Sequence, residues 1–555
     1  MRLRLRLLAL SLLSFSAVKA QDVYVPYDRD TYHLIDRYQI KYGTEVPELQ
    51  TSVRPYGRRD VAALAEVGAR NTISAADQFN TQYLLNDNWN YTNRAKDSEQ
   101  VFLKYFYRKP SDLYHYESDV FTLRVNPVLH LEAGYDNQSD GMRYINTRGV
   151  QLEGTIDEKF GFYTFIGENQ AKFPSYVVDR IKRDNVVPHE GFWKTFKGDG
   201  YDFITARGYL NYAPSKHVEL QLGHDRHFIG DGYRSLIYSD YAPPAFFLKL
   251  NANVWRIHYQ SLWQELISEF RRTGRDELFP KKYMALHRLG INITDNFNLG
   301  LFEQIVFARD EGKFELQYLN PIIFYRSIEQ GLGSEDNAML GADFRWNIYN
   351  RVQLYGQLML DEFLLREMKA GNGWWANKQA AQVGAKYIDA FGLPNLDLQG
   401  EVNIIRPYTY QHVDQFTNYQ HYNQPLAHPT GANLYELVGI VRYQPIPRLN
   451  LTAKAIATQY GQDEYLETDT LNWGNNVNLS YLTRAQDYGN EIGQGIKTNQ
   501  VHLDLTASFQ LRHNVFVDLK QILRRTDAEL NTLDKNTAFT SVAFRWNIPQ
   551  RLHEF

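Results

Sequence analysis

Residues 394–461 read PNLDLQGEVNIIRPYTYQHVDQFTNYQHYNQPLAHPTGANLYELVGIVRYQPIPRLNLTAKAIATQYG and contain three segments in which apolar and polar residues alternate. The apolar positions are Leu396, Leu398, Val402 and Ile404 in the first segment, Tyr435, Leu437, Val441 and Tyr443 in the second, and Leu449, Leu451, Ala453, Ala455 and Ala457 in the third. Alternation over this length predicts strands with one apolar and one polar face. Pro445 and Pro447 predict a tight turn between the second and third strands, because proline fixes φ and lacks a ladder donor.

The connection between the first two segments is much longer and is rich in Tyr, His, Asn and Gln. Long strands joined alternately by tight turns and long loops are typical of an outer-membrane β-barrel. In such a barrel the polar face lines the lumen and the apolar face contacts lipid. The residues expected in the lumen are Asp397, Gln399, Glu401 and Asn403, and those expected to face lipid are Leu398, Val402 and Leu451.

The composition of the 555-residue chain fits a barrel better than a bundle of membrane helices. Its mean hydropathy of −0.49 is too low for such a bundle, whereas in a barrel only every second strand residue faces lipid. The aromatic fraction of 14% fits interface girdles and aromatic loops. Composition alone leaves open a tyrosine-rich soluble β-sandwich.

Cysteine usage and charge narrow the function classes further. Cysteine is absent, which excludes disulfides, thiolate metal ligands and cysteine nucleophiles. The net charge is −4, and the sequence has no basic patch of the kind that binds nucleic acid. We therefore expect no nucleic-acid partner.

The N-terminus has the pattern of a secretory signal peptide at residues 1–20. Three arginines precede an apolar run at Leu7–Val18, and Val18-Lys19-Ala20 fits a cleavage site. Gln21 follows the expected cut, so the chain lacks the cysteine that a lipid anchor needs. The sequence therefore predicts export, with a second segment at residues 21–97 and a barrel at residues 98–555.

The segment at residues 21–97 differs from the rest because it has helical patterns. Val61–Val67 reads as one helix, and a second helix follows Ser74, which has capping-box spacing with Asp77. Phe79 and Tyr83 form an i,i+4 stripe on that second helix. This element could cover the periplasmic mouth, plug the lumen or meet a periplasmic partner. Plugging is favoured, because short helices need something to pack against.

Strand patterns continue to the end of the chain and predict an all-β, transmembrane, antiparallel barrel of about 18 strands, with a range of 16 to 20. Besides the three segments above, the predicted strands are 119–126, 128–135, 148–156, 160–168, 203–212, 217–227, 255–262, 283–293, 297–307, 340–348, 352–361, 380–390, 501–511, 515–523 and 538–548. Strict alternation of short and long links requires a further strand at Ala245–Leu250 and then one at Val101–Tyr107. The last strand is expected to end near Ile548.

One segment, residues 220–234, concentrates residues that could bind a metal, but their spacing argues against it. His224, Asp225, His227 and Asp231 are the candidate ligands. Neighbouring residues of a strand point to opposite faces, and no typical zinc spacing is present. We expect no metal and no cofactor, and instead a polar lumen wall with a sugar-contacting loop that includes His227 and Arg234.

A serine hydrolase is the enzymatic alternative, since Ser235 and Ser239 lie near His227 and Asp240 in the sequence. Proximity in sequence does not establish triad geometry, and the chain has no G-x-S-x-G motif. We therefore expect the protein to be non-enzymatic.

The long loops carry the stronger functional signal. Their aromatic and polar residues are Tyr408, Tyr410, His412, Tyr419, His421, Tyr422, Asn423, Gln424 and His428 in one loop, Trp374 and Trp375 in a second, and Trp473 in a third. Aromatic faces stack on sugar rings, and amide and imidazole groups bond sugar hydroxyls. An interfacial girdle is the alternative, but it explains aromatics at strand ends better than aromatics in mid-loop. The loops therefore predict a polysaccharide-binding surface on the outer face.

Three blocks also resemble the Wzi family of capsule-assembly outer-membrane proteins, and in particular the Bacteroidota branch that includes gliding-motility-associated members. The blocks are GHDRHFIGDGYRSLIYSD at Gly223–Asp240, YLNPIIFYRSIEQGLGSEDNAMLGAD at Tyr318–Asp343, and IRPYTYQHV with NYQHYNQPLAHPTGANLYEL between Ile405 and Leu437. The resemblance implies an outer-membrane barrel with a helical plug-like element that holds capsular polysaccharide or exopolysaccharide at the cell surface. It does not fix which residues contact sugar.

The resulting expectation is a monomeric outer-membrane lectin in contact with outer-membrane lipid. An oligosaccharide-conducting porin and an adhesion component are the alternatives. A periplasmic partner or a gliding-motility apparatus could contact the helical segment. The identity of the glycan is not encoded in any motif of the sequence.

Overall fold

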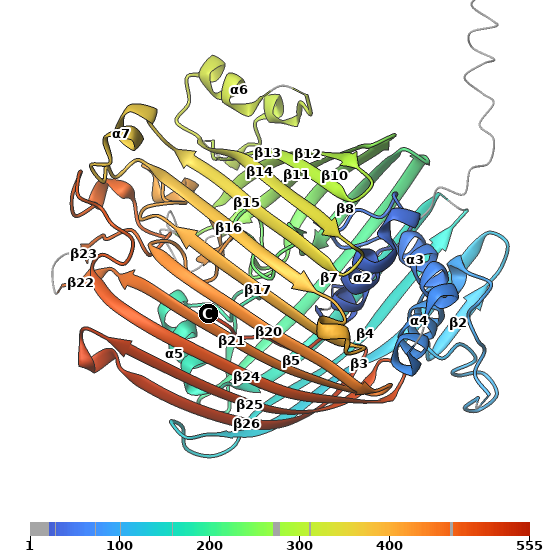
Figure 1. Ribbon diagram of the computed structural model, residues 1–555. Coiled ribbons are helices and arrows are strands. Elements are labelled where there is room, and N and C mark those ends of the chain that lie inside the picture. Colours follow the sequence, from blue (N-terminus) through green and yellow to red (C-terminus); the bar gives the residue numbers. More distant parts are fainter. Residues whose placement is uncertain are drawn as a thin grey trace, which may run out of the picture.

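A computed structural model describes residues 22–555 except 28, 73, 100, 158, 270–277, 310–311, 323 and 467–469. The signal peptide predicted at residues 1–20 lies outside the described residues. Within the described chain, eighteen long antiparallel strands close into a barrel (Figure 1). They are β3 (Phe121–Asp136), β4 (Arg143–Ile156), β5 (Phe160–Lys172), β7 (Gly200–Ser215), β8 (Val218–Asp225), β10 (Ala245–Val254), β11 (Ile257–Ile267), β12 (Lys281–Thr294), β13 (Phe297–Phe307), β14 (Asn337–Ile348), β15 (Val352–Glu362), β16 (Lys378–Tyr387), β17 (Leu396–Ile405), β20 (Leu434–Ile446), β21 (Leu449–Gln462), β24 (Ile496–Arg512), β25 (Val515–Ala528) and β26 (Lys535–Trp546).

Shorter elements extend or decorate this barrel. β2 (Tyr114–Glu117) pairs with β3, and β6 (Lys194–Phe196) pairs with β7. The two-residue strands are β1 (Val53–Arg54), β9 (Phe228–Ile229), β18 (Gln420–His421), β19 (Gln424–Pro425), β22 (Glu464–Tyr465) and β23 (Thr470–Leu471). The 3₁₀ helices are η1 (Gly43–Glu45), η2 (Trp89–Tyr91), η4 (Leu316–Leu319), η5 (Ala390–Gly392), η6 (Gln415–Thr417), η7 (Tyr481–Thr483) and η8 (Asn531–Leu533).

The predicted number of strands is confirmed, because the eighteen predicted segments count β3 twice and omit β10, so that these two errors cancel. The strands predicted at 119–126 and 128–135 form the single strand β3, and the strand inferred at Ala245–Leu250 exists as β10. The segment Val101–Tyr107, inferred as a strand, lies outside the barrel and forms only an isolated bridge. β26 ends at Trp546, close to the predicted end of the last strand.

Pro127 explains why β3 reads as two strands. It lies within β3, but β26 pairs with β3 only from Leu129 onwards, and β2 pairs with β3 only as far as Val125. Pro127 therefore lies between the stretch of β3 that pairs with β2 and the stretch that pairs with β26. No strand on that edge needs a hydrogen bond from residue 127, so the missing N–H of proline costs no ladder bond. Its carbonyl accepts a hydrogen bond from Asn547 Nδ2 at 2.8 Å.

The alternation predicted for β17 is confirmed. Glu401 and Asn403 are buried on the lumen side, at 1% and 0% exposure. Val402, between them in sequence, is 43% exposed on the outer side, and Leu451 on β21 is 38% exposed. Burial of the polar face means that the lumen is filled, and four inward segments fill it.

The N-terminal helices provide the first of these segments. α2 (Arg29–Tyr42), α3 (Arg58–Asn71) and α4 (Ala75–Asp87) lie at the end of the barrel where the short turns are, to the right in Figure 1. The predicted cap is present, since Asp77 N donates to Ser74 Oγ at 2.9 Å. Short turns mark the periplasmic end of an outer-membrane barrel.

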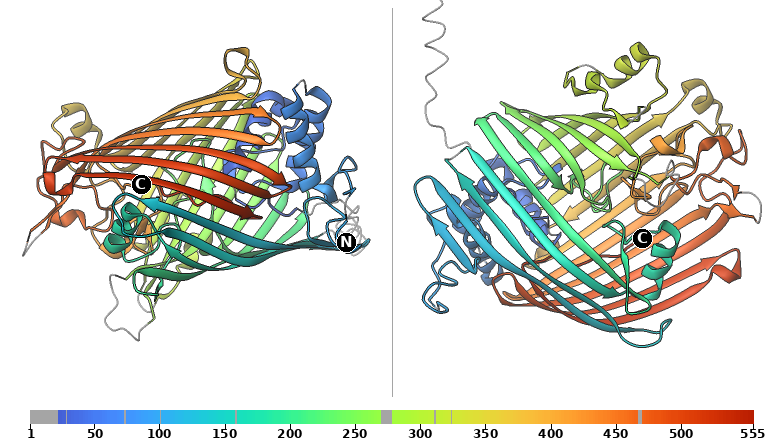
Figure 2. Two further views of the ribbon diagram at one scale, coloured as in Figure 1. Left: turned by 90° about the horizontal axis from the view of Figure 1, so that it is seen from below. Right: turned by 180° about the vertical axis from the view of Figure 1, so that it is seen from behind.

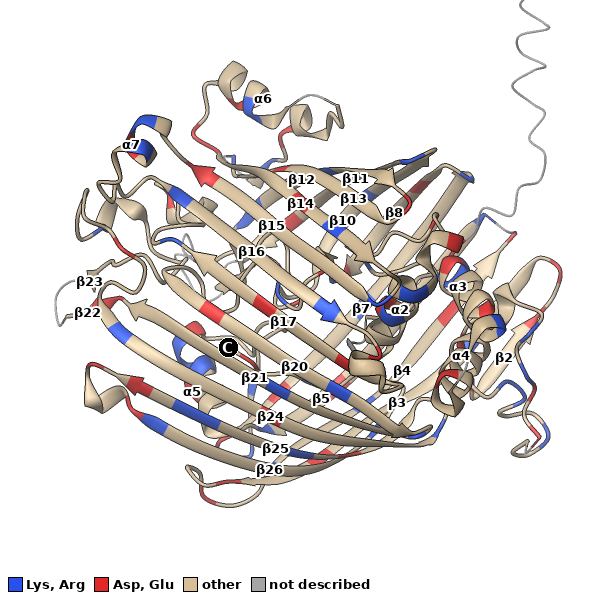
Figure 3. Cartoon of the chain, viewed as in Figure 1, with Lys and Arg blue, Asp and Glu red and all other residues tan. Residues whose placement is uncertain are grey.

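Charged contacts hold this helical element against the inner wall. Lys386 on β16 pairs with Asp36 at 2.8 Å, and Arg58 pairs with Glu153 on β4 at 3.1 Å. Arg37 pairs with Asp389 at 2.5 Å. Figure 3 shows both signs of charge interleaved along the helices and the neighbouring strand ends. Because the contacts reach several sides of the barrel, the element occupies its mouth.

The opposite, outer end carries the long loops and three further helices (Figure 2). α5 (Ser175–Asp184) lies in the loop after β5, α6 (Tyr325–Leu332) in the loop after β13, and α7 (Leu365–Ala370) in the loop after β15. Within the described residues, no helix has the length and apolar character needed to span a membrane.

Residues 547–555 provide a second inward segment. They leave β26 and enter the lumen, where Figure 1 marks the C-terminal end. Arg551 pairs with Glu190 at 3.0 Å, and Arg234 Nη2 donates to the Glu554 carbonyl at 2.6 Å. Phe555 is 5% exposed. This segment therefore links the loop after β5 to the loop after β8.

Candidate functional site

The loop after β8, residues 226–244, folds into the lumen and meets the N-terminal element there. β9 in this loop pairs with β1, with Val53 opposite Ile229. The Asp231 carboxylate accepts hydrogen bonds from Thr51 Oγ1 at 3.0 Å and from Ser52 Oγ at 2.6 Å. This loop contains all of the GHDRHFIGDGYRSLIYSD block except Gly223–Asp225, which end β8, so most of the block builds the interior of the barrel.

The charged residues Asp231 and Arg234 of that block have different partners. Arg234 Nε donates to Glu436 at 3.0 Å, and Asp231 bonds the N-terminal element as described. His227 is 3% exposed and packs edge-on against Phe247 at 4.4 Å. Among the residues that the structure describes, no group of three His, Cys, Asp or Glu side chains converges on a common point.

The loop after β8 is thus the third inward segment, and the loop after β17, residues 406–433, is the fourth. Tyr410 and Tyr419 are 1% and 0% exposed. Their hydroxyls donate to the carbonyls of Leu236 at 2.9 Å and Ile237 at 2.7 Å, both in the loop after β8. The expectation that this loop stands free on the outer face is wrong, because hydroxyl bonds and ring packing draw it into the barrel.

The other predicted residues of this loop are mostly buried too. Tyr408 donates to the Asn472 carbonyl at 3.1 Å, and His421 Nδ1 accepts from Ile267 N at 2.9 Å. His428 lies 3.0 Å from Glu436. Burial lowers the pKa of His412 to about 4 and that of His421 to about 3. Both imidazoles are therefore neutral at neutral pH.

Tyr422 and Asn423, at the tip of the loop, are half-buried. Tyr422 packs edge-on against Phe192 at 5.2 Å, and Asn423 Nδ2 donates to Glu269 at 2.9 Å. These two side chains are the part of the predicted loop that comes nearest to the outer surface.

Trp374 and Trp375 lie in a different environment, where two outer loops join. Gly489 N donates to the Asn372 carbonyl, and Asn490 N donates to the Gly373 carbonyl, both at 2.9 Å. Trp375 N also donates to the Asp487 carbonyl at 2.9 Å. Backbone bonds of this kind hold the loop after β15 against the loop after β21 without using any side chain.

Aromatic side chains gather at this junction, which we call the outer platform (Trp374, Trp375, Tyr481, Arg484 and Tyr488). The Trp374 and Trp375 rings are 6.1 Å apart, and Tyr481 packs against Trp375 at 4.6 Å. The Arg484 guanidinium lies 4.4 Å from the Trp375 ring. Trp375 thus contacts Trp374, Tyr481 and Arg484. Both tryptophans are half-buried, and Tyr488 is 54% exposed.

A groove of about 530 Å³ borders the outer platform. Its lining is mostly polar and includes Glu367, Asn372, Asn377, Gln379, Arg406, Tyr435, Asn490 and Glu491. Amide, carboxylate, guanidinium and phenol groups can all hydrogen-bond sugar hydroxyls. Aromatic rings beside such groups form the combination that carbohydrate binding requires.

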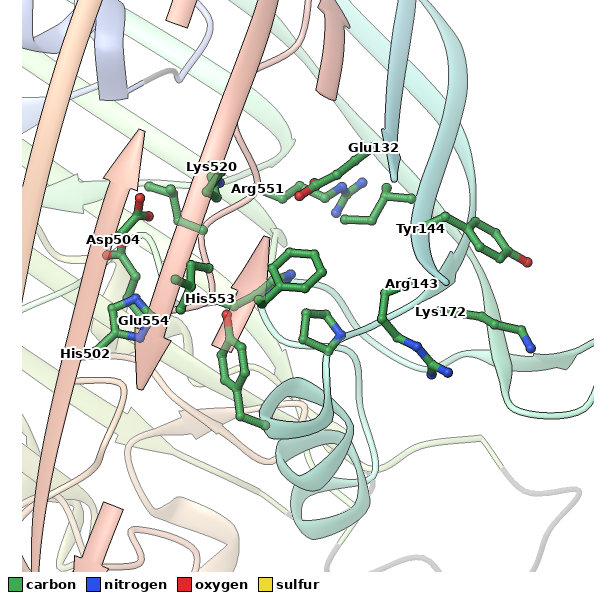
Figure 4. A pocket seen from close by; sticks show the side chains of 16 residues that line it. Glu132, Arg143, Tyr144, Lys172, His502, Asp504, Lys520, Arg551, His553 and Glu554 are labelled. Atoms are coloured by element: carbon green, nitrogen blue, oxygen red, sulfur yellow. The ribbon is translucent and has the colours of Figure 1, made fainter. Parts of the chain in front are cut away.

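The lumen offers less space. The cavity in Figure 4, beside Glu132, His502 and Arg551, has a volume of about 20 Å³. That is room for about one water molecule. A second cavity, beside Arg207 and Arg226, reaches about 80 Å³. Neither cavity accommodates a sugar ring, so the groove at the outer end is the better candidate site.

Sequence reasoning identified Trp374 and Trp375 but missed their partners. Tyr481, Arg484 and Tyr488 belong to the stretch WGNNVNLSYLTRAQDYGNE, residues 473–491. It contains aromatic and amide residues in mid-loop, the same signal that drew attention to residues 406–433. The sequence analysis singled out only Trp473 at the start of this stretch, and applying the same criterion to its remaining residues would have identified Tyr481 and Tyr488.

Comparison with known proteins gives the family. The family model described as capsule assembly protein Wzi matches residues 115–537. The chain belongs to this family. Together with the closed barrel of eighteen strands in the described residues, membership confirms the predicted outer-membrane location. A search of curated proteins found no match.

Solved structures share the fold at low sequence identity. Wzi of Escherichia coli, described as an outer membrane protein involved in group 1 capsule assembly and a carbohydrate binding β-barrel, gives a TM-score of 0.57 at 12% identity, covering 96% of this chain and 100% of that one. OprD of Pseudomonas aeruginosa gives 0.41 at 13% identity, covering 76% and 94%. OccAB2 of Acinetobacter baumannii gives 0.40 at 10% identity, covering 77% and 97%.

Proposed function

We propose that this protein binds surface polysaccharide at the outer platform and the groove beside it, and so holds capsule or exopolysaccharide at the cell. The observation that carries the proposal is the presence of a half-buried Trp374 and an exposed Tyr488 on two loops joined by backbone hydrogen bonds, next to a polar groove. Rigid aromatic surface binds at low entropic cost. The description of the Escherichia coli structure as a carbohydrate-binding barrel is consistent with it.

The residues predicted from sequence divide into two groups under this proposal. Trp374 contacts sugar and Trp375 fixes the platform, while Tyr422 and Asn423 extend the surface at the next loop. Tyr408, Tyr410, His412, Tyr419, His421 and His428, together with His227 and Arg234, hold the inward loops in place. Many weak contacts along a repeating polymer add through avidity, so no deep pocket is needed.

The chemistry of the groove favours a polymer with acidic sugars. Arg406 lines the groove, and a guanidinium matches a carboxylate better than a hydroxyl because of its planar donor geometry. Glu367 and Glu491, which also line the groove, can accept hydrogen bonds from sugar hydroxyls. The protein acts without catalysis and as a monomer. The link to gliding motility is a further expectation, which a motility assay of platform variants would test.

The test replaces both rings, in the double variant Trp374→Ala/Tyr488→Ala. The probe is polysaccharide extracted from the surface of the cells that make the protein. Truncating aromatic anchors at a binding surface costs about 2 kcal/mol or more. The affinity of the purified protein should therefore fall at least about tenfold, and the cells should release polysaccharide.

A matched control exists at the other end of the barrel. Trp255 and Tyr349 lie in short turns and are 82% and 94% exposed. The double variant Trp255→Ala/Tyr349→Ala removes the same two ring types and should bind normally. Equal binding by both double variants would remove the outer platform from the site.

The porin alternative is tested separately. Three of the four inward segments meet in the lumen, through β1–β9 pairing and through the bonds of Tyr410 and Tyr419 to residues 236–237. We therefore propose a closed barrel and expect no steady conductance in a planar bilayer. Large steady conductance by the full chain would favour transport of oligosaccharides over retention of polymer.

A further inference from the structure

The outer wall of the barrel has a row of polar side chains where lipid-facing residues are expected. Ser261 on β11 lies opposite His287 on β12, which lies opposite Glu303 on β13. Glu303 lies two residues after Leu301 on β13, and Leu301 is 54% exposed on the outer side of the barrel. Side chains two residues apart share a face, so this row points outward.

The polar row is nevertheless buried. Ser261 is 0% exposed and Glu303 is 4% exposed. His287 Nε2 lies 3.2 Å from the Glu303 carboxylate. A carboxylate and an imidazole facing bare acyl chains would be costly. Something must cover them, and the loop after β13 does so.

We call the described residues 312–336 of this loop, without residue 323, the outer flap. The backbone N–H groups of Tyr325 and Arg326, at the start of α6, donate to the Glu303 carboxylate at 2.8 and 3.0 Å. The Tyr325 ring stacks on His287 at 4.3 Å. Trp263 Nε1 donates to the Tyr318 carbonyl at 2.8 Å. The flap therefore lies on the outside of β11, β12 and β13, as Figure 1 shows for α6.

The flap exposes four large apolar side chains close together in sequence. They are Leu316 at 72%, Leu319 at 38%, Ile322 at 87% and Phe324 at 72%, whereas Lys313, Gln317 and Glu335 are exposed polar residues of the flap. Within α6 the exposed residues Arg326, Ser327 and Gln330 are polar. An exposed apolar group of this size marks an interaction surface.

We propose that the outer flap lies in the outer leaflet of the membrane, with Leu316, Ile322 and Phe324 in contact with acyl chains and α6 at the level of the headgroups. The occupant is lipid because the patch continues the apolar band of the barrel wall. Leu301, Leu289 and Leu340 on β13, β12 and β14 are 54%, 36% and 45% exposed on the same side. The flap thereby gives the polar row a covalently attached cover and adds a lipid-binding surface beyond the strands.

The absence of cysteine makes the test direct, because a single introduced thiol is the only one to label. The full chain, refolded into lipid nanodiscs, carries a nitroxide at Ile322→Cys or, in a second variant, at Phe324→Cys. Leu301→Cys on the barrel wall gives the value for lipid. Thr532→Cys, exposed in the loop after β25, gives the value for water.

The collision rates of each nitroxide with oxygen and with a polar nickel chelate then show whether that nitroxide lies in lipid or in water. At Ile322 and Phe324 we expect the ratio of oxygen to nickel collisions to match that at Leu301 and to exceed that at Thr532 several-fold. A ratio like that of Thr532 would place the flap in water and overturn the proposal. Low collision rates with both reagents would indicate burial against a second protein, which would also overturn it.

Discussion

The loop after β17 and the two loops of the outer platform are similar in composition but differ in position. Both contain aromatic residues together with Asn and Gln in mid-loop. In the first, Tyr410 and Tyr419 are buried and their hydroxyls bond backbone carbonyls of another inward loop. In the second, Trp374 and Tyr488 keep accessible ring surface. Aromatic content therefore identifies a structured loop without saying what the rings contact.

The two regions differ in which groups form hydrogen bonds with the backbone of the loops. The outer platform forms its own backbone bonds between residues 372–375 and 487–490, so its side chains are spared for other contacts. The loop after β17 uses side chains to bond carbonyls and amides in the lumen. Its rings are part of a core, and removing them should affect folding before it affects binding.

The largest expected effect follows from that distinction. Tyr419→Ala should destabilise the protein by about 3–5 kcal/mol, as for other buried aromatic residues, and Tyr410→Ala should act similarly. Chemical denaturation in detergent micelles measures this loss. Any release of polysaccharide by these variants would follow the loss of folded protein.

Tyr419→Phe is the matched control, because it keeps the ring and removes only the hydroxyl. That hydroxyl bonds the Ile237 carbonyl and Gln304, so we expect a loss of about 1–2 kcal/mol. If Tyr419→Ala were as stable as the natural chain and yet failed to bind polysaccharide, the inward loop would be a binding surface and the comparison would fail.

A smaller effect should come from acid, through the N-terminal element that supports the inward loops. Burial by itself would raise the pKa of Asp36, but Lys386 and Arg54 outweigh it and hold the pKa at about 2. The folded pKa lies below the unfolded value of about 3.9. The stability that this carboxylate contributes is therefore present above pH 4 and lost as the pH falls from about 4 to about 2.

The loss amounts to about 2–3 kcal/mol for a shift of this size. The measurement is the free energy of unfolding at pH 7, 4 and 2.5 for the natural chain and for Asp36→Asn. The variant should be less stable at pH 7 and should lack this part of the acid-induced loss. If the free energy of unfolding changed with pH in the same way for both proteins, the Asp36 carboxylate would not contribute to holding the N-terminal element in place.

The features that followed from local pattern were predictable from the sequence. Strand alternation in β17 and the Ser74 cap depend on neighbouring residues only, and both are confirmed. The interruption at Pro127 was read as a strand end, because the sequence does not show that two different partners flank that edge of β3.

Loop position was not predictable in the same way. Whether Tyr419 turns inward depends on Ile237 and Gln304, which are distant in sequence and belong to separate elements. Glu303 is an intermediate case. It interrupts the apolar face of β13, and a carboxylate at a lipid-facing position is a signal that something covers it. That reading requires only the strand pattern.

The smallest expected effect separates the groove from the platform. Tyr435, at the start of β20, lines the groove and is 44% exposed. Its hydroxyl is the part suited to bond a sugar, and a neutral hydrogen bond contributes about 0.5–1.5 kcal/mol. Tyr435→Phe should therefore weaken binding of the extracted polysaccharide by up to about tenfold, with no change in the denaturation midpoint. Titration calorimetry with the purified protein measures the change, and Tyr443→Phe, a 39% exposed tyrosine at the other end of the same strand, is the control. A loss in the control equal to that in Tyr435→Phe, or none in either, would confine binding to the platform rings, because the groove would then contribute no hydrogen bond of its own.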